Sequence, residues 1–406
     1  MREGHDCIEA AIEPSSRPCH EYAIALDERV PGELVPEVAE KLAYVSEAAR
    51  SVRLADDGSR VEIALDDPAQ LATVSAQVRE TVSALVRGYR EIPKEILWQH
   101  PVESTHQAPI WDDLLARGVL ASSGSGCVTL LGDASRIVAA LDRTFTAIAH
   151  DVFGAVDHRY PVLISRDAME RCDYFAAFPH HLTFAPHLRE SVETLTSVAN
   201  ATREDRGRAV LDALSTPTHI LTPAVCFHTY AWLADRALTD PVVITAVNHC
   251  FRWESTNFAT CERLWDFSMR EIVFAGDGDW VEARRSDAVA AIRRLVERLG
   301  VDSWLETAND PFFVTRFAAK RYFQLLTQAK FELRASLPYA GGSLAVASFN
   351  VHHDFFGRAF GVRLGDGFAS TGCVAFGLER WMWALFAQHG PELAAWPRDV
   401  RTALEV

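Results

Sequence analysis

The sequence contains no run of about 18 consecutive apolar residues, the length that a helix needs to span a bilayer, so we expect no membrane segment. Its first residues, MREGHDCIEAAIEPSSRPCH, lack the apolar core of a secretory signal. Basic residues are scarce, since 40 Lys and Arg stand against 55 Asp and Glu, for a net charge of -15. These absences predict a cytoplasmic protein without a broad nucleic-acid surface, because such a surface needs clustered cations.

The cysteines are scattered along the chain and do not suggest a disulfide framework. In a chain of 406 residues without a secretory signal, we expect reduced thiols or metal ligands instead. The eight cysteines stand at positions 7, 19, 127, 172, 226, 250, 261 and 373.

What the chain does contain indicates two folded parts. Pro14, Ser15, Ser16 and Pro18 mark residues 1–18 as a flexible lead. Residues 19–110 are predicted to form a small N-terminal α/β domain, with a hairpin turning at Asp56-Asp57-Gly58 and an amphipathic helix over 71–89. The proline-rich stretch 91–125 resembles a connector. The first 100 residues hold 11 basic and 19 acidic residues, a net of -8.

Residues 111–406 predict an α+β domain with an antiparallel sheet flanked by helices. A helix capped by Asp133 and ended by Gly154 carries an apolar stripe, and a strand over 160–165 follows it. Residues 186–218 are predicted to be a polar helical insertion. Strands are expected at 242–255, 263–274, 330–336, 343–355 and 368–376, the last running into a helix.

Charged side chains interrupt two of these strands, in the stretch CFRWESTNFATCERLWDFSMREIVF of residues 250–274. Because strand side chains alternate, Arg252 and Glu254 should share a face, and Arg263, Phe267 and Glu271 should share one on the returning strand. Arginine forks suit phosphate oxygens, and an aromatic ring can stack on a purine. Surface hairpins also carry such charges, but the joint spacing of the two arginines, the acids and the aromatic residue favours a binding platform.

The segment FRWE, followed by a short loop and then Arg263, Phe267 and Glu271, resembles motif 2 of class II aminoacyl-tRNA synthetases. CVAFGLERW at 373–381 resembles motif 3, with Gly377 and Arg380 at its helix start. The helix and strand at 133–165 are similar to motif 1, and 343–355 to the substrate-side strand of seryl-tRNA synthetases. The resemblance implies their antiparallel sheet, flanked by helices, and a homodimer.

The same resemblance implies an ATP site and adenylate-forming chemistry. Arg252 would hold the α-phosphate, Glu254 would face adenine and Phe267 would stack on it, while Arg263 and Arg380 would clamp the γ-phosphate. The catalytic residues would then be Arg252 and Arg380. Seryl enzymes place an acid for Mg2+ near 344–345, but this chain has Leu344 and Ala345. Glu332 or Asp354 would serve instead, or ATP alone would hold the magnesium.

Glu271 is expected on an apolar strand face, where an ionised carboxylate is unfavourable unless it is paired or metal-bound. With Cys226 and Cys373 it resembles the zinc ligands of methanogen-type seryl-tRNA synthetases and of amino acid:[carrier protein] ligases. Two thiolates and a carboxylate suit Zn2+ and leave a fourth position open. In those families the open position takes the substrate amine. A buried cysteine is also common without any metal. Ser348 and Asn350 are the predicted substrate-binding residues, and His352 shares their face.

Three functions remain open. The first is a ligase that activates a small amino acid with ATP and transfers it to a phosphopantetheinylated carrier protein, with no tRNA partner. The others are a seryl-type aminoacyl-tRNA synthetase and a non-catalytic synthetase paralogue. The acidic N-terminal part, the short motif 2 loop and the absence of a basic coiled-coil arm favour the ligase. Its docking arginines would lie in the insertion, at positions 189, 203, 206 and 208. The sequence names neither the amino acid nor the carrier.

Overall fold

A computed structural model describes residues 19–89, 94–254, 258–309 and 327–406. The predicted lead at 1–18 and residues 255–257 of the motif 2 loop lie outside these ranges. The chain divides into two compact units, Met1–Arg90 and Glu91–Val406. The division therefore falls before the boundary at residue 110 that we expected from the sequence. Among the described helices, none is long and apolar enough to cross a membrane.

The first unit is a three-stranded antiparallel sheet, in the order β1-β3-β2, with two helices. The predicted hairpin is present. Its turn requires glycine at position 58, because Gly58 has φ +66 and a Cβ there would lie 2.8 Å from the Val30 carbonyl oxygen. One face of the sheet and the helices share an aliphatic core that includes Val61, Val38 and Val74. The elements are β1 (His20–Ala25), α1 (Val35–Leu42), β2 (Ala49–Leu54), β3 (Arg60–Leu65) and α2 (Leu71–Gly88).

The second unit is built on an eight-stranded sheet in the order β4-β13-β14-β15-β18-β12-β11-β7. All neighbouring strands pair antiparallel except β7, which runs parallel to β11. The α+β class predicted from the sequence is thus confirmed. The strands are β4 (Ile96–His100), β7 (Val156–Asp157), β11 (Val242–Phe251), β12 (Asp266–Gly276), β13 (Ser303–Thr307), β14 (Lys330–Leu337), β15 (Gly342–His353) and β18 (Ser370–Gly377).

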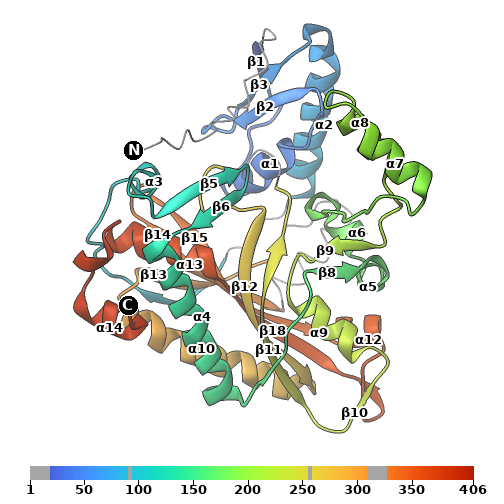
Figure 1. The fold of residues 1–406 in the computed structure, drawn as a ribbon. Coiled ribbons are helices and arrows are strands. Elements are labelled where there is room, and N and C mark those ends of the chain that lie inside the picture. Colours follow the sequence, from blue (N-terminus) through green and yellow to red (C-terminus); the bar gives the residue numbers. More distant parts are fainter. Residues whose placement is uncertain (1–18, 90–93, 255–257, 310–326) are drawn as a thin grey trace, which may run out of the picture. The chain divides into compact units, whose positions relative to one another are not determined.

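Helices cover both sides of this sheet (Figure 1). On one side lie α4 (Gly132–Phe153), α10 (Gly278–Leu299) and α13 (Leu378–His389), which bury the main core with α14 (Arg398–Leu404). Phe145 of α4 stacks on Phe376 of β18, with ring centroids 4.1 Å apart. On the other side lie α5 (Arg166–Arg171), α9 (Cys226–Leu233) and α12 (Phe355–Phe360), which share a second core. The candidate site occupies this second side.

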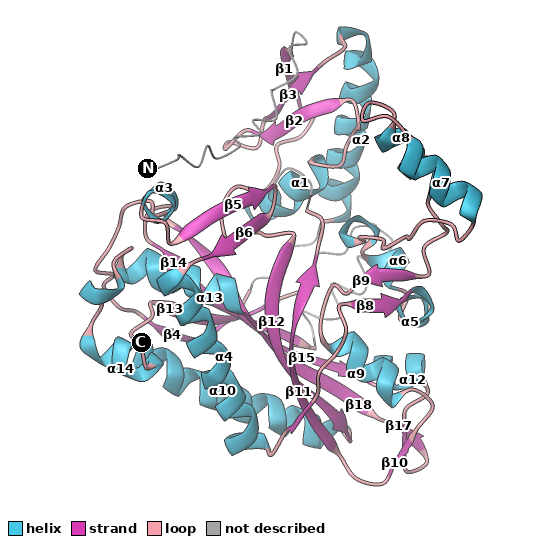
Figure 2. Cartoon of the chain, viewed as in Figure 1, coloured by secondary structure: helices cyan, strands magenta, loops and turns pink. Residues whose placement is uncertain are grey.

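The remaining short elements surround these layers (Figure 2). The predicted insertion contains two helices, α7 (Val192–Asn200) and α8 (Arg206–Ala213), which pack on each other. The others are α3 (Trp111–Ala116), α6 (Tyr174–Ala177), β5 (Leu120–Gly124), β6 (Cys127–Leu130), β8 (Leu163–Ser165), β9 (His219–Leu221), β10 (Ala237–Leu238), β16 (Arg363–Leu364) and β17 (Gly367–Phe368).

Three local predictions were wrong. The stretch 91–125 is more than a connector, because β4 forms an edge of the large sheet by pairing with β13. The strand expected at 160–165 is only β8, which pairs with β9 in a separate ribbon. The N-cap of α4 is Leu131 rather than Asp133, which lies in the first helical turn. In contrast, Gly154 ends α4 in the left-handed conformation, as predicted.

Candidate functional site

The hairpin of β11 and β12 carries the residues predicted to bind ATP, but not all of them lie on strands. Its ladder ends with the pair Phe251 and Asp266, so Arg252, Glu254 and Arg263 lie just beyond it, in the connecting segment. The expectation that both arginines lie on strands was therefore wrong. The alternation still places Cys250 across from Phe267, on the face that also carries Glu271.

Arg252 is held at the edge of this face by two contacts. Its Nε donates to the carbonyl oxygen of Pro223 at 2.9 Å, and its guanidinium carbon lies 5.5 Å from the centroid of the Phe267 ring. The Arg252 backbone N–H donates to the Trp265 carbonyl at 3.0 Å, which continues the hairpin by one bond. A guanidinium fixed in this way can meet a phosphate with little loss of side-chain entropy.

Arg263 and Arg380 converge near Glu254. Arg263 forms an ion pair with Glu254 through its Nη1. Arg380, at the start of α13, donates from Nε to the Glu262 carbonyl at 3.0 Å and from Nη1 to the Ala345 carbonyl at 3.3 Å. Burial raises the pKa of Glu254, but the two arginines outweigh this and leave its pKa below the usual range. The structure thus brings together two of the predicted arginines and the predicted acid.

Glu271 points from β12 to the start of α9. Its two carboxylate oxygens accept from the backbone N–H groups of Val225 and Cys226, each at 3.1 Å. These N–H groups belong to the first turn of the helix, where the helix itself supplies no acceptor. Glu271 is only 1% exposed, and it satisfies these donors while lying at the positive end of the helix. This cap explains how a carboxylate can lie on an apolar face.

Cys226, Glu271 and Cys373 form one buried cluster. Their ligand atoms all lie within 4.8 Å of one another. Hydrogen bonding to Cys373 raises the pKa of the Cys226 thiol, whereas the same bond, with His352 and Asn350, lowers the pKa of Cys373 well below its ordinary value. Burial raises the pKa of Glu271 to about 8. Three acidic groups this close cannot all ionise without a compensating cation.

The donor set of this cluster fits a zinc ion. Zinc prefers thiolate and carboxylate donors in a tetrahedral arrangement, and three protein ligands leave one position open. With Zn–S bonds of about 2.3 Å, two ligand atoms on one ion lie roughly 3.5–4 Å apart. The ligand atoms of the cluster all lie within 4.8 Å of one another, so they are close enough to be candidates for binding one ion. Each Glu271 oxygen retains a second lone pair beside the one that accepts the helix N–H.

The predicted substrate residues lie next to this cluster. Ser348 and Asn350 are on β15 and face the same side of the sheet, since Asn350 pairs with Cys373 of β18. The Asn350 amide nitrogen lies 3.0 Å from the Ser348 Oγ and 3.4 Å from the Cys373 Sγ. Asn350 therefore already contacts a member of the cluster.

Other polar residues of the site did not stand out from the sequence. Tyr230 lies one turn after Cys226 on α9, and its hydroxyl is 3.2 Å from His352 Nδ1. Tyr230 follows Cys226 by four residues, so in a helix that begins at Cys226 the two side chains share a face; this spacing could have identified Tyr230. Tyr339 donates to Glu262 at 2.5 Å, and this bond steadies the segment that holds Arg380.

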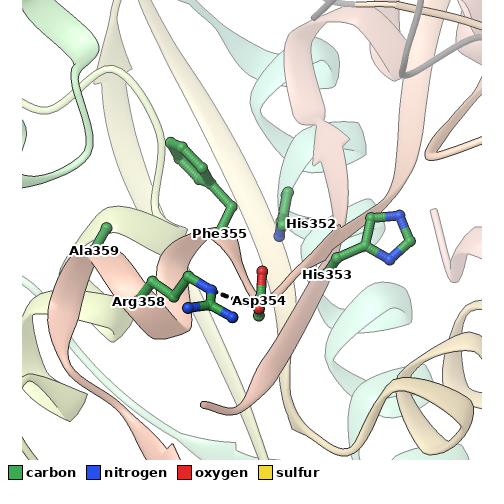
Figure 3. Close-up of a pocket in the computed structure, with 6 residues that line it drawn as sticks. All are labelled: His352, His353, Asp354, Phe355, Arg358 and Ala359. Atoms are coloured by element: carbon green, nitrogen blue, oxygen red, sulfur yellow. Dashed lines mark hydrogen bonds and ion pairs between the residues drawn. The ribbon is translucent and has the colours of Figure 1, made fainter. Parts of the chain in front are cut away.

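The two acids proposed for magnesium have different surroundings. Glu332 faces the site side of the sheet across from Ser348, with Lys330 at 3.1 Å and Arg334 at 3.4 Å. Asp354 follows β15 and pairs with Arg358 at 2.6 Å, beside a pocket of about 460 Å3 (Figure 3). Glu332 shares the sheet face with the site, whereas Asp354 lies at a surface pocket.

Comparison with curated proteins identifies two groups of relatives. The chain is 32% identical over 259 residues to amino acid–[acyl-carrier-protein] ligase 1 of Bradyrhizobium diazoefficiens, covering 63% of this chain and 78% of that protein. It is 33% identical over 249 residues to ligase 2 of the same organism, covering 61% and 73%. It is also 28% identical over 254 residues to the type-2 serine–tRNA ligase of Methanococcus aeolicus, of which it spans about half, 48%.

Solved structures agree on the fold. The crystal structure of M. kandleri SerRS in complex with A. aeolicus tRNASec matches with a TM-score of 0.70 at 22% identity, covering 96% of this chain and 78% of that one. The cytoplasmic serine–tRNA ligase of Naegleria fowleri in complex with AMP matches with a TM-score of 0.57 at 12% identity, covering 83% and 79%. No family model matches the chain. The fold is thus that of a class II aminoacyl-tRNA synthetase.

Proposed function

The chain belongs to the family of amino acid–[acyl-carrier-protein] ligases, and from this premise we propose that it activates a small amino acid with ATP and transfers the aminoacyl group to the phosphopantetheine thiol of a carrier protein. The observation that supports this most directly is one sheet face with two features: Phe267, beside which Arg252 lies, and the pair Glu271 and Cys373, which cluster with Cys226 of α9. Such a face can hold ATP and an amino acid side by side, as adenylate formation requires.

We assign the nucleotide to the arginine-rich edge. Arg252 would hold the α-phosphate and stabilise the charge that develops there when the amino acid carboxylate attacks. Phe267 would carry the adenine ring and Glu254 would accept from its amine, while Arg263 and Arg380 would bind the leaving diphosphate, with Mg2+. Removing a fixed donor of this kind costs about 10²–10³ in rate in other enzymes.

We assign the amino acid to the acidic cluster. A zinc ion bound by Cys226, Glu271 and Cys373 would supply an open coordination position for a neutral α-amine. The protein's own residues would fix the rest of the amino acid, with Ser348 and Asn350 of β15 as the side chains that contact it. Glycine, alanine and serine are the trial substrates, by resemblance to the family.

The carrier protein would dock on the helical insertion of α7 and α8. Val192 is 83% exposed there and Leu211 is 69% exposed, and Arg203 and Arg208 are exposed beside them. Carrier proteins are commonly acidic, so apolar contacts ringed by arginines would suit them. Arg189 contributes less, because its Nη1 donates to the Asp212 carbonyl at 2.8 Å. The family resemblance also leads us to propose a homodimer and a cytoplasmic location.

A single gel tests the acceptor. Labelled glycine, alanine or serine is incubated with ATP and enzyme, together with holo-carrier, apo-carrier or total tRNA. We expect a hydroxylamine-labile label on the holo-carrier alone. Label on tRNA would indicate a serine–tRNA ligase instead, and equal label on the apo-carrier would exclude the phosphopantetheine thiol as acceptor.

Two variants test the docking surface with a matched control. Arg203→Glu and Arg208→Glu should raise the KM for the holo-carrier and leave amino-acid-dependent diphosphate exchange unchanged. Arg398→Glu makes the same charge change at an exposed position of α14 and should alter neither quantity. If Arg398→Glu raises the KM as much as the insertion variants, net charge rather than docking is responsible.

A further inference from the structure

We propose that His352 is a positioning residue whose Nε2–H donates to the Cys373 sulfur and orients it as a metal ligand, and whose ring separates that sulfur from the neighbouring pocket. The inference rests on the proposed function, because it concerns the metal cluster of the same site. It assigns to His352 a task distinct from contact with the amino acid or ATP.

The contacts of His352 are arranged around both ring nitrogens. His352 lies near the end of β15, and its Nε2 is 4.0 Å from the Cys373 Sγ of the neighbouring strand β18. Its Nδ1 lies 3.2 Å from the Tyr230 hydroxyl and 3.4 Å from the Thr371 Oγ1. Elements far apart in sequence, namely α9, β15 and β18, thus fix one imidazole ring.

If the Cys373 sulfur binds a metal, these contacts favour the tautomer with the proton on Nε2. Tyr230 and Thr371 both bear hydroxyl groups, which can donate to an unprotonated Nδ1. A sulfur that binds a cation is an anion and accepts hydrogen bonds. With the proton of His352 on Nε2, that nitrogen can donate to the sulfur, and the lone pair of Nδ1 can accept from the Tyr230 or the Thr371 hydroxyl. The opposite tautomer would place a bare nitrogen against the sulfur, where two acceptors repel each other.

The ring also forms a wall of the pocket lined by His352, His353, Asp354, Phe355, Arg358 and Ala359 (Figure 3). Phe356 packs edge-on against it, with ring centroids 4.8 Å apart, and Tyr230 does the same at 6.0 Å. Cys373 is only 4% exposed. His352 therefore lies between this pocket of about 460 Å3 and the sulfur.

The N–H donor can be tested apart from the bulk of the ring. His352→Gln places an amide N–H near the position of Nε2, whereas His352→Leu retains much of the bulk and no donor. In other proteins, removing a residue that hydrogen-bonds to a metal ligand lowers metal affinity by about 10–100-fold. We expect His352→Leu to lose zinc affinity by about this factor and His352→Gln to retain most of it.

The experiment measures zinc affinity by competition with a chromophoric chelator for the wild type and both variants. Co2+ is then bound to each, and its thiolate charge-transfer band reports the sulfur ligands without any activity assay. A weakened His352→Leu rescued by His352→Gln supports the inference. Equal affinity in all three proteins, or an equal loss in both variants, overturns it. Circular dichroism of the metal-free proteins checks that each is folded.

A third variant covers the case in which His352→Leu does not fold. Tyr230→Phe keeps the aromatic ring and removes one hydroxyl that holds Nδ1, so it should lower zinc affinity by a smaller factor. Unchanged affinity and an unchanged Co2+ band in this variant would overturn the inference. A wild-type protein that binds no zinc would refute the metal assignment in the proposed function, whereas zinc-binding wild type with insensitive variants refutes this inference alone.

Discussion

Replacing Glu271 by alanine should damage the protein in two separable ways. The first is loss of the helix cap, because the carboxylate accepts N–H groups from Val225 and Cys226, each at 3.1 Å. Each such bond contributes about 1–3 kcal/mol, and both donors would remain buried without an acceptor. We therefore expect Glu271→Ala to lower the free energy of unfolding by about 2–6 kcal/mol in the presence of a chelator.

The second effect appears only when zinc is added. A ligand held at 100 times its Kd stabilises the folded state by about 2.7 kcal/mol if it binds only that state. The wild type should gain this amount in buffered zinc, and Glu271→Ala should gain almost none. The difference between the two proteins should thus widen by about 3 kcal/mol when zinc replaces the chelator.

The assay is urea denaturation of both proteins in chelator and in buffered zinc. Glu332→Ala provides the control, because Glu332 is another acid on the same side of the sheet and pairs with Lys330 and Arg334. It should lose stability by a similar amount in both buffers. An equal zinc gain in Glu271→Ala and the wild type would refute the ligand assignment. Unchanged stability of Glu271→Ala in chelator would refute the cap.

Three further outcomes follow from other contacts. Burial raises the pKa of Glu379 to about 7, so the native state binds its proton more tightly than the unfolded state; the contribution of Glu379 to stability should fall by up to about 3 kcal/mol as the pH rises from about 4.5 to 7, and Glu379→Gln should lessen the fall of the wild type by this amount in urea titrations. Arg252→Lys keeps the charge but loses the fork, and should lower amino-acid-dependent diphosphate exchange about 10²-fold, with normal exchange contradicting its phosphate role. Arg270 Nε donates to Asp142 at 2.5 Å from the opposite face of β12, so Arg270→Met alone should cost about 3–5 kcal/mol and pairing it with Asp142→Leu should recover much of this in a double-mutant cycle.

The sequence was sufficient for the features that depend on local chemistry and spacing. Alternation along 242–276 placed Glu271 and Phe267 on one strand face, and β12 confirms that face by its register with β11. Gly154 was predicted to end α4 because few other residues adopt the left-handed conformation, and it does so at φ +60. The motifs around Arg252 and Arg380 identified the fold class before any distance was known.

Tertiary structure decided the features that depend on residues far apart in the chain. Residues 96–100 show no strong strand pattern of their own, and they become β4 only because β13 offers an open edge. The N–H groups that donate to Glu271 belong to a helix that begins 45 positions earlier in the chain. Strand periodicity could therefore indicate an unfavourable carboxylate, but it could not identify the N–H groups that satisfy it. His352 was recognised only by its face, since its partners Tyr230, Thr371 and Cys373 reach it across α9 and β18. Sequence spacing determines which way a side chain points along its own element, whereas the packing of separate elements determines what it meets there.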